Sequence, residues 1–452
     1  MTSSPSVSTY DEVLHELGVS LAAVDARPGE IVAGPLPPSL LAQLTAAGDD
    51  ALRRRAVATW EAPNGRLFAL GEAVRLSGAR GHDPGEAFAA LRALRVRELA
   101  PMSAGRPRLF GGFEFDPFNP CRDDRWEGLG GWQFVLPSVL LEEQAGEWSG
   151  SVTVRWQRSP QALAEAIACA LEGVPAAPVG PGRRPVPGAD PRAWTASVAE
   201  AVRRIHRGAF EKVVLARSIE LECDRERPEI VARLAERYPA TFVFSLRACD
   251  ATWLGATPER LVSLHHGRVR AASLAGSRPR AADPAEDDRL AAELFASAKE
   301  RAEHAVVVEV VREALEPLCT MLTVPREPEL MRIPNIQHLY TPVAGQVRPG
   351  VDIFGLVAAM HPTPAVGGWP RQASLAAIRE LEAMDRGWYA APIGWVDLAG
   401  EGEFAVALRS ALIEPGRATL YAGAGVVAGS DPEQELAETE LKLRPLREAV
   451  TR

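Results

Sequence analysis

Two pairs of strand-like segments joined by short turns constrain the fold more than any other feature of the sequence. The segment "RLVSLHHGRVRAASL" turns at His266-Gly267, and "EFAVALRSALIEPGRATLYAGAG" turns at Pro415-Gly416. Apolar and β-branched residues on both sides of such turns predict β-hairpins, whose strands are antiparallel. The chain is therefore expected to build antiparallel sheets.

Further strands and several helices are predicted between and around these hairpins. Strands are expected at "KVVLARSIEL" and "TFVFSLRA". Asp190-Pro191 predicts an N-cap and the first turn of a helix that runs to about Arg207. A long helix is expected from about Pro284 to Leu318. Ser430 and Glu433 form the S-x-x-E capping pattern of another helix, expected from about Asp431 to Arg447. Hairpins mixed with long helices indicate an α+β fold in which helices cover antiparallel sheets.

A segment rich in proline and glycine divides the chain. Residues 174–192 contain six prolines and three glycines, which disfavour regular structure and predict a connector. Residues 1–173 precede it and contain the strand-like segments "RLFGGFEF" and "GWQFVLPSVLLEE". Residues 193–452 follow it and carry almost all of the candidate functional clusters.

Composition excludes several classes of protein. The net charge is −9 and the arginines are interspersed with acids, so a nucleic-acid partner is not expected. The five cysteines are scattered and form no C-x-x-C pair, which indicates neither a zinc site nor a disulfide framework and fits a reducing cytoplasm. The first residues show no basic stretch followed by an apolar one, so no signal peptide is expected, and no apolar run approaches the roughly 18 residues of a membrane span. We expect a soluble, cytoplasmic protein without a membrane partner.

Lysine is rare in this chain. Of its 50 lysines and arginines, only Lys212, Lys299 and Lys442 are lysine. Arginine replaces lysine well on solvated surfaces, but its guanidinium keeps its proton in proteins, whereas an ammonium can lose one and is more compact. Chance is the alternative explanation, but each lysine is a candidate for chemistry that arginine cannot perform.

Two acidic clusters fall on predicted helices. Glu435, Glu438 and Lys442 share one helix face, and the alternative to a functional role is a solvated stripe worth about 0.3 to 0.5 kcal/mol. Glu300 and Glu303 immediately precede an apolar run, where an unpaired carboxylate is costly unless it binds a cation or protonates. Facing helices could offer these oxygens to Mg²⁺, which takes one or two protein carboxylates together with waters and a substrate anion. The clusters predict a magnesium site that binds an acidic substrate.

A glycine-rich segment, "LYAGAGVVAGSDP", lies just before the last of these helices. Gly423, Gly425 and Gly429 give G-x-G-x-x-x-G, and the helix opens only after Ser430, so the segment does not fit the dinucleotide-binding turn. No Walker-type phosphate loop occurs in the chain. Glycines after a strand let backbone N–H groups approach an anionic ligand closely.

Nine distinctive segments follow one another between about residues 190 and 445. They are "FEKVVLAR", "GATPERLVSL", "SLAGSRPR", "SAKERAEH", "IQHLYTPVAG", "HPTPAVGG", "DRGWYAAPIGW", "FAVALRSALI" and "YAGAGVVAGSDPEQELAETELK". Together they resemble the chorismate-utilising enzymes, which include isochorismate, anthranilate, aminodeoxychorismate and salicylate synthases. "FGGFEFDP" extends a weaker similarity into the front part. The resemblance implies a large α+β sandwich of two antiparallel sheets with helices outside and the active site in the cleft between them. Residues 1–173 would then add strands to this fold, and 193–452 would form the chorismate-binding catalytic region.

The resemblance also implies roles for individual residues. Lys212 matches the lysine that activates water, and Glu259 the acid that protonates the departing hydroxyl. Glu303 and Glu438 match Mg²⁺ ligands, with Glu435 contributing directly or through water. The positions that match groups around the substrate are Arg409 and Lys442, the backbone from Gly423 to Gly425, and Gly276, Ser277, His338 and Ala365 near the ring.

The chemistry of chorismate agrees with these roles. Chorismate is a dianion with a hydroxyl on a ring diene, and moving that hydroxyl requires water to attack one carbon while hydroxide leaves another. Such a step needs a base for the water and an acid for the leaving group. A lysine base must be neutral, which arginine cannot become, and a glutamic acid needs a raised pKa. Mg²⁺ would orient the substrate and neutralise charge.

Details of the motifs favour one branch of this family. The anthranilate enzymes typically carry glutamine where Lys212 stands and use ammonia from a glutaminase, and aminodeoxychorismate synthases carry a nucleophilic lysine where this chain has Leu274. "HPTPAVGG" resembles isochorismate synthases, and "GSDPEQE" resembles the menaquinone-pathway members. We predict an isochorismate synthase, an isomerase that acts as a monomer without a glutaminase subunit.

Other functions stay open at this point. A salicylate synthase would share the lysine and then eliminate pyruvate. A non-catalytic chorismate-binding homologue would lack an acid, base or metal ligand, and a metal-dependent phosphotransferase would need a phosphate loop. Whether the product feeds menaquinone, a siderophore or another compound is not decided by the motifs.

Overall fold

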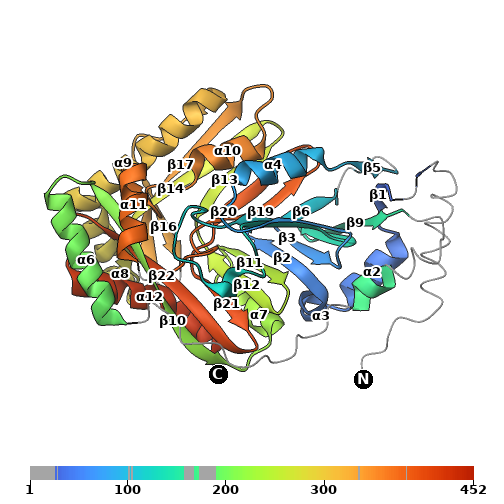
Figure 1. The fold of residues 1–452 in the computed structure, drawn as a ribbon, viewed down its shortest axis with the longest axis horizontal. Coiled ribbons are helices and arrows are strands. Elements are labelled where there is room, and N and C mark those ends of the chain that lie inside the picture. Colours follow the sequence, from blue (N-terminus) through green and yellow to red (C-terminus); the bar gives the residue numbers. More distant parts are fainter. Residues whose placement is uncertain are drawn as a thin grey trace.

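The structure, a computed structural model, describes residues 26–27, 29–99, 102, 105–156, 167–172, 190–333, 336–382 and 384–451. Most of the predicted connector, residues 174–189, lies outside the described residues. The described strands form a 12-stranded and a 10-stranded sheet with helices on their outer sides (Figure 1). Apart from the parallel pair β1–β5, the paired strands of these sheets are antiparallel, as the hairpin signals predict.

The strands of the 12-stranded sheet are, in spatial order, β18 (Gly368–Trp369), β10 (Lys212–Cys223), β22 (Gly416–Val426), β21 (Ser410–Glu414), β12 (Ala251–Thr257), β11 (Phe242–Ala248), β2 (Ala56–Ala62), β3 (Gly65–Leu70), β8 (Val139–Gln144), β9 (Glu147–Arg155), β1 (Ile31–Pro35) and β5 (Val96–Glu98). The strands of the 10-stranded sheet are β15 (Cys319–Thr323), β17 (Ile336–Val347), β14 (Arg268–Pro279), β13 (Arg260–His265), β20 (Gly402–Val406), β19 (Pro392–Asp397), β6 (Arg108–Phe113), β7 (Trp132–Leu136) and β4 (Val74–Gly78), with β16 (Glu329–Ile333) paired to β17.

Helices cover both sheets. Those that pack on the 12-stranded sheet are α2 (Pro38–Ala46), α3 (Asp49–Arg55), α6 (Pro191–His206), α7 (Arg227–Arg237), α11 (Arg371–Leu381) and α12 (Pro432–Val450). Those that pack on the 10-stranded sheet are α4 (Pro84–Ala93), α8 (Pro284–Ala296), α9 (Ala298–Leu315) and α10 (Ile353–Met360). Two short 3₁₀ turns, η1 (Asp124–Trp126) and η2 (Glu316–Leu318), complete the described elements.

Both sheets combine strands from before and after the proline-rich segment. In the 12-stranded sheet, β2 pairs with β11, and Phe244 lies opposite Trp60. In the 10-stranded sheet, β6 pairs with β19, and Gly394 lies opposite Gly111. The front and back parts of the chain are therefore interleaved in one architecture.

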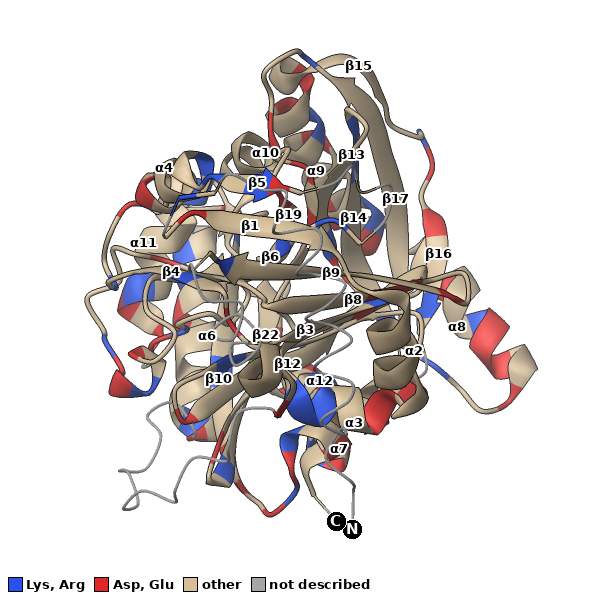
Figure 2. Ribbon diagram, turned by 90° about the vertical axis from the view of Figure 1, so that its right-hand side faces the viewer, with Lys and Arg blue, Asp and Glu red and all other residues tan. Residues whose placement is uncertain are grey.

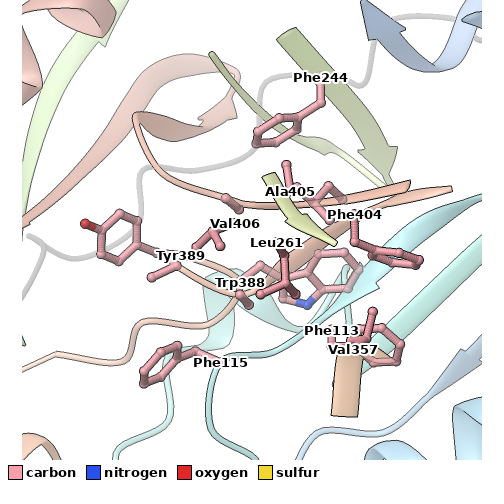
Figure 3. Packing of buried hydrophobic residues seen from close by; sticks show 14 of the residues in the cluster. Phe113, Phe115, Phe244, Leu261, Val357, Trp388, Tyr389, Phe404, Ala405 and Val406 are labelled. Carbon is pink, nitrogen blue, oxygen red and sulfur yellow. The ribbon is translucent and has the colours of Figure 1, made fainter. Parts of the chain in front are cut away.

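The two sheets enclose an aromatic core. Phe113, Phe244 and Phe404 are buried in one hydrophobic cluster that draws on strands of both sheets. Figure 3 shows this packing, with Tyr389 at its margin and its hydroxyl directed away from the other labelled side chains. The interior between the sheets thus holds aromatic and aliphatic side chains in one buried cluster.

The hairpin at His266-Gly267 forms as predicted, between β13 and β14. Both turn residues have positive φ, +51° and +72°, which a two-residue type I′ turn requires. The second hairpin also forms at Pro415-Gly416, but its first strand is shorter than the predicted segment. Only β21 and β22 pair across Pro415, whereas residues 402–406 form β20 in the other sheet. The chain crosses from one sheet to the other between them, a long-range event that local turn signals do not reveal.

The capping residues of two helices differ from those that the sequence predicted, and they change where one of the helices is divided. The long helix expected from Pro284 to Leu318 is broken at Ser297, which leaves the helical conformation and whose hydroxyl accepts a hydrogen bond from the N–H of Glu300. The last helix is capped by Asp431, whose carboxylate accepts from the N–H groups of Glu433 and Gln434, and Ser430 instead accepts from Val427. A carboxylate next to a helix N-terminus also interacts favourably with the helix dipole.

The charged residues of the described chain are mixed in sign over the helices and loops. Figure 2 shows blue and red segments interleaved, with most of the strand area tan. No described helix has both the length and the apolar character that crossing a bilayer requires.

Candidate active site

A pocket with an empty volume of about 870 Å³, including its open mouth, lies where the two sheets meet. Strands β10 and β22 of one sheet and β14 and β17 of the other line it, together with α9 and α12. Among the residues that line it are all but one of the predicted site residues: Lys212, Glu259, Gly276, Ser277, Glu303, His338, Ala365, Arg409, Gly423, Gly425, Glu438 and Lys442.

Glu435 is the exception, because it is buried outside the pocket lining. It lies three residues before Glu438 on α12, so it is about 4.5 Å further along the helix axis and rotated by about 60°. Helical spacing therefore places the two carboxylates on neighbouring parts of one face, and the role of Glu435 as a metal ligand, direct or through water, stays a prediction.

Lys212 begins β10 and is buried at the pocket. Its Nζ lies 2.6 Å from Oε1 of Glu303 on α9, and its backbone carbonyl accepts a hydrogen bond from the Ser374 hydroxyl at 2.8 Å. Gly425, on the neighbouring strand β22, leaves room for this side chain. A Cβ at position 425 would stand only 3.1 Å from Cε of Lys212. A larger residue there would press on the lysine.

Glu438 and Lys442 form a second ion pair on α12. Oε1 of Glu438 lies 2.7 Å from Nζ of Lys442, which also donates to the carbonyl of Gly423 at 2.9 Å. In an antiparallel strand the N–H and C=O of one residue point to the same side. The N–H of Gly423 therefore faces the side on which Lys442 lies, and not toward β10.

The two pocket carboxylates fit a divalent cation. No three acidic, histidine or cysteine side chains of the described residues gather closely enough to hold a metal by themselves. Glu303 and Glu438 nevertheless reach one pocket from different helices, and each is paired with a lysine side chain. Two carboxylates completed by waters and a substrate anion are the donor set that Mg²⁺ favours.

Glu259 and Arg409 lie where the chain crosses between the sheets. Glu259 follows β12 and precedes β13, and Arg409 lies between β20 and β21 with φ of +46°. The two crossings are hydrogen-bonded to each other. The N–H of Val406 donates to the carbonyl of Glu259 at 3.0 Å, and the N–H of Ala256 donates to the carbonyl of Arg409 at 3.1 Å. The backbone thus holds an acid and a cation side by side.

Burial gives Glu259 the properties of a general acid. Its side chain belongs to a residue that is 6% exposed, and this desolvation raises the pKa of Glu259 to about 7. The nearby charges of Lys212, Lys442 and Arg409 act in the opposite direction and are outweighed. A carboxyl group with this pKa is partly protonated at neutral pH and can donate a proton.

Arg409 has a hydrogen-bonding group directed at no described protein acceptor. The residue is 8% exposed, and its Nη1 is buried without a partner among the described residues. Burial lowers the pKa of Arg409 to about 10, so the guanidinium stays charged at neutral pH. A buried, charged donor without an acceptor is costly unless a ligand supplies one. This arginine therefore marks a site for an anion.

His338, on β17 of the 10-stranded sheet, binds the guanidinium of Arg409. Nη2 of Arg409 donates to Nε2 of His338 at 3.3 Å, and Nδ1 of His338 lies 2.9 Å from the Ser277 hydroxyl. Burial, with Arg409 and Lys442 adding to it, lowers the pKa of His338 to about 3. The ring is therefore neutral, with its proton on Nδ1. Gly276, with φ of +78° at a bulge in β14, changes the strand register just before Ser277.

Three pocket residues with polar side chains were not identified from the sequence. Tyr389 and Tyr421 line the pocket and stack on each other with ring centroids 5.6 Å apart, and Arg386 lies beside them. All three belong to segments that resemble the family, "DRGWYAAPIGW" and "YAGAGVV". An aromatic or arginine residue inside such a segment was the available signal.

The fold and the site together define an α+β sandwich enzyme whose buried, cationic pocket holds a proton donor. Residues 41–451 match the family model described as chorismate binding enzyme. The chain belongs to this family, and the predicted family and sandwich fold are confirmed.

Named relatives cover most of the chain. It is 39% identical over 422 residues to the salicylate biosynthesis isochorismate synthase of Pseudomonas aeruginosa, covering 90% of this chain and 87% of that protein. It is 37% identical over 358 residues to the isochorismate synthase MenF of Bacillus subtilis, covering 77% and 75%. The solved structure of MenF, the menaquinone-specific isochorismate synthase from Escherichia coli, superposes with a TM-score of 0.78 at 26% identity, covering 98% and 99%.

Proposed function

We propose that this protein is an isochorismate synthase, an isomerase that converts chorismate to isochorismate by adding water at C2 and removing the hydroxyl at C4. The observation that carries the proposal is the presence, in one pocket, of Lys212, of a glutamic acid with a pKa near 7 and of a buried guanidinium whose Nη1 has no partner among the described residues. The names of the relatives support the same activity.

Lys212 and Glu259 would carry the proton transfers. Lys212, in its neutral form, would take a proton from the attacking water, and Glu259 would give its proton to the departing hydroxyl. Both residues are buried, and low exposure to water strengthens the interactions between charges and dipoles around them. Water addition at one carbon and water loss at another leave the composition of the substrate unchanged.

The substrate's carboxylates would be bound by the cationic groups of the pocket. Arg409 offers Nη1, and Lys442 lies beside Glu438 on the side that the N–H of Gly423 faces. Glu303 and Glu438 would hold Mg²⁺, which supplies charge neutralisation and a fixed orientation for a substrate carboxylate when bound. We also expect the protein to act as a monomer, without a glutaminase subunit, in the cytoplasm.

Product analysis tests the proposal. The purified protein is incubated with chorismate and Mg²⁺, the products are separated by chromatography, and pyruvate is assayed in the same tube. Isochorismate without pyruvate is expected. Salicylate with an equal amount of pyruvate would move the protein to the salicylate synthases, and no conversion would reject both activities.

The metal is tested by Glu438→Gln. Removing one anionic oxygen from the pair of carboxylates should raise the Mg²⁺ concentration needed for half-maximal rate and lower the rate at saturation. Titration of Mg²⁺ against initial rate measures both effects, with Glu433→Gln, an exposed glutamate on the same helix, as control. Full activity of the unaltered protein in excess chelator would contradict the metal site.

A further inference from the structure

A buried ion pair lies behind one wall of the pocket. Glu382 follows α11, and Arg386 is 2% exposed although it lines the pocket. Nε of Arg386 lies 2.8 Å from Oε2 of Glu382. The proposed reaction assigns no task to either residue.

Beyond the end of the edge strand β18, the side chains of Glu382 and Arg386 bind backbone groups of β10. The two-residue strand β18 pairs with β10 at Lys212 and Val213. Further along β10, the N–H of Ala216 donates to Oε1 of Glu382 at 2.7 Å, and the carbonyl of Val214 accepts from Nη2 of Arg386 at 2.7 Å. Backbone groups that a neighbouring strand would satisfy are satisfied here by two side chains.

The same guanidinium also holds the segment that faces β10. Nη1 of Arg386 donates to the carbonyl of Val366 at 2.9 Å, and Val366 and Ala365 line the pocket. The ring of Phe115, labelled in Figure 3, covers the guanidinium at 4.3 Å from its centroid. Nε, Nη1 and Nη2 each have a protein acceptor, so this arginine, unlike Arg409, is not available to bind an anion.

We infer that Glu382 and Arg386 are positioning residues for the proposed reaction. They fix the strand that carries Lys212 against the wall formed by Ala365 and Val366, and so set the distance between the base and the substrate ring. The inference rests on the proposed function for its catalytic consequence. A displacement of about 1 Å in such a group can reduce the rate about 10²-fold.

Arg386→Met is the direct test. We expect kcat with chorismate to fall about 10²-fold with KM little changed, because the anion-binding groups are untouched. Arg386→Lys should have a kcat between those of the wild type and of Arg386→Met. It keeps a charge opposite Glu382 but lacks the planar fork that reaches the carbonyls of Val214 and Val366. Should Arg386→Met not fold, Glu382→Gln replaces it, with a loss of kcat in the same direction expected.

Arg53→Met is the matched control. Arg53 and Glu61 form another buried pair, with contacts of 2.8 and 2.9 Å, between α3 and β2, and neither lines the pocket. This variant should lower Tm while kcat at a temperature well below Tm stays at the wild-type value. A wild-type kcat in the Arg386 and Glu382 variants, or an equal loss in Arg53→Met, would overturn the inference.

Hydrogen exchange measured without substrate separates this inference from the proposed function. Peptides that cover residues 212–217 and 363–368 should exchange faster in Arg386→Met than in the wild type and unchanged in Arg53→Met. Unchanged exchange in Arg386→Met would refute the positioning role even if chorismate is a substrate. A wild-type protein that leaves chorismate unconverted would reject the proposed function. The exchange rates would then still decide whether Glu382 and Arg386 hold β10 against Ala365 and Val366.

Discussion

At the scale of single residues, the ability of Lys212 to give up a proton is the property that arginine cannot supply. Lys212→Arg should therefore lose turnover as completely as Lys212→Ala, while the affinity for chorismate changes little. Steady-state rates and substrate binding by calorimetry measure the two effects. An arginine variant with wild-type kcat would show that positive charge, and not proton transfer, is what position 212 provides.

Glu259 should impose an alkaline limit on activity. Because its pKa is raised to about 7, the proton that it donates is lost as the pH rises through that value. We expect kcat/KM to fall above about pH 7, since this ratio reports the groups of the free enzyme. A rate profile from pH 5 to 9 measures the limit, and a flat profile over this range would contradict the assignment of Glu259 as the acid.

The Glu259 carboxyl group should also make the free energy of unfolding depend on pH. The folded state binds its proton up to about pH 7, whereas the unfolded chain releases it near the usual value of 4.5. The free energy of unfolding should therefore fall as the pH rises from 4.5 to 7, by up to roughly 3 kcal/mol. Glu259→Gln should remove this decrease, and urea unfolding at pH 5 and pH 8 measures it. An unchanged pH dependence in the variant would refute the burial of a protonatable group.

At the scale of elements, Arg217 attaches α12 to β10. The residue is 2% exposed, and its Nη1 donates to Thr439 at 2.9 Å and to Glu440 at 2.8 Å, the two residues that follow Glu438 on α12. Arg217→Met should cost about 2 kcal/mol of unfolding free energy, because hydrogen bonds to charged groups contribute about 1.5 to 3 kcal/mol.

Arg444 provides the comparison on the same helix. Its ion pair with Glu448 is exposed and screened by water, so Arg444→Met should cost clearly less unfolding free energy than Arg217→Met. Thermal and urea unfolding of both variants measure the difference, and the Mg²⁺ dependence of the rate should shift only in Arg217→Met. Equal costs for the two substitutions would show that Arg217 does not fix the helix.

Local chemistry explains which elements could be predicted from the sequence. Turn residues identified the hairpin at His266-Gly267, and Asp190-Pro191 located the start of α6, because these signals act within a few residues. The break at Ser297 was missed because the apolar pattern continues through it. The assignment of residues 402–406 to the second sheet could not be predicted, since it depends on pairing with strands distant in sequence.

Some residues of the candidate site could be predicted from the sequence, and others could not. Residues of distinctive chemistry inside resembling segments, such as Lys212, Glu259 and Arg409, do meet in one pocket. Glu435 is not among the residues that line it, and helical spacing alone does not show which part of a helix face reaches a cavity. Arg386 and Tyr389 were missed because their importance arises from packing that only the assembled sheets create.

At the scale of the whole molecule, the interleaving of strands predicts that the back part cannot fold alone. Removing residues 1–173 would uncover the edges of β11 and β19, which pair with β2 and β6. Such unpaired edges favour aggregation. A fragment of residues 190–452 should show no cooperative unfolding transition and no conversion of chorismate, by calorimetry and product analysis. A fragment that unfolds cooperatively would show that the front part is a separate unit.

The paired crossings that carry Glu259 and Arg409 have a consequence for the order of folding. Their mutual hydrogen bonds join residues far apart in the sequence, and contacts of this kind form late because long loops must close first. A nascent chain that has completed one sheet would hold neither the dehydrated acid nor the fixed guanidinium. The pocket is thus among the last features to mature, and catalytic competence reports on the completion of folding.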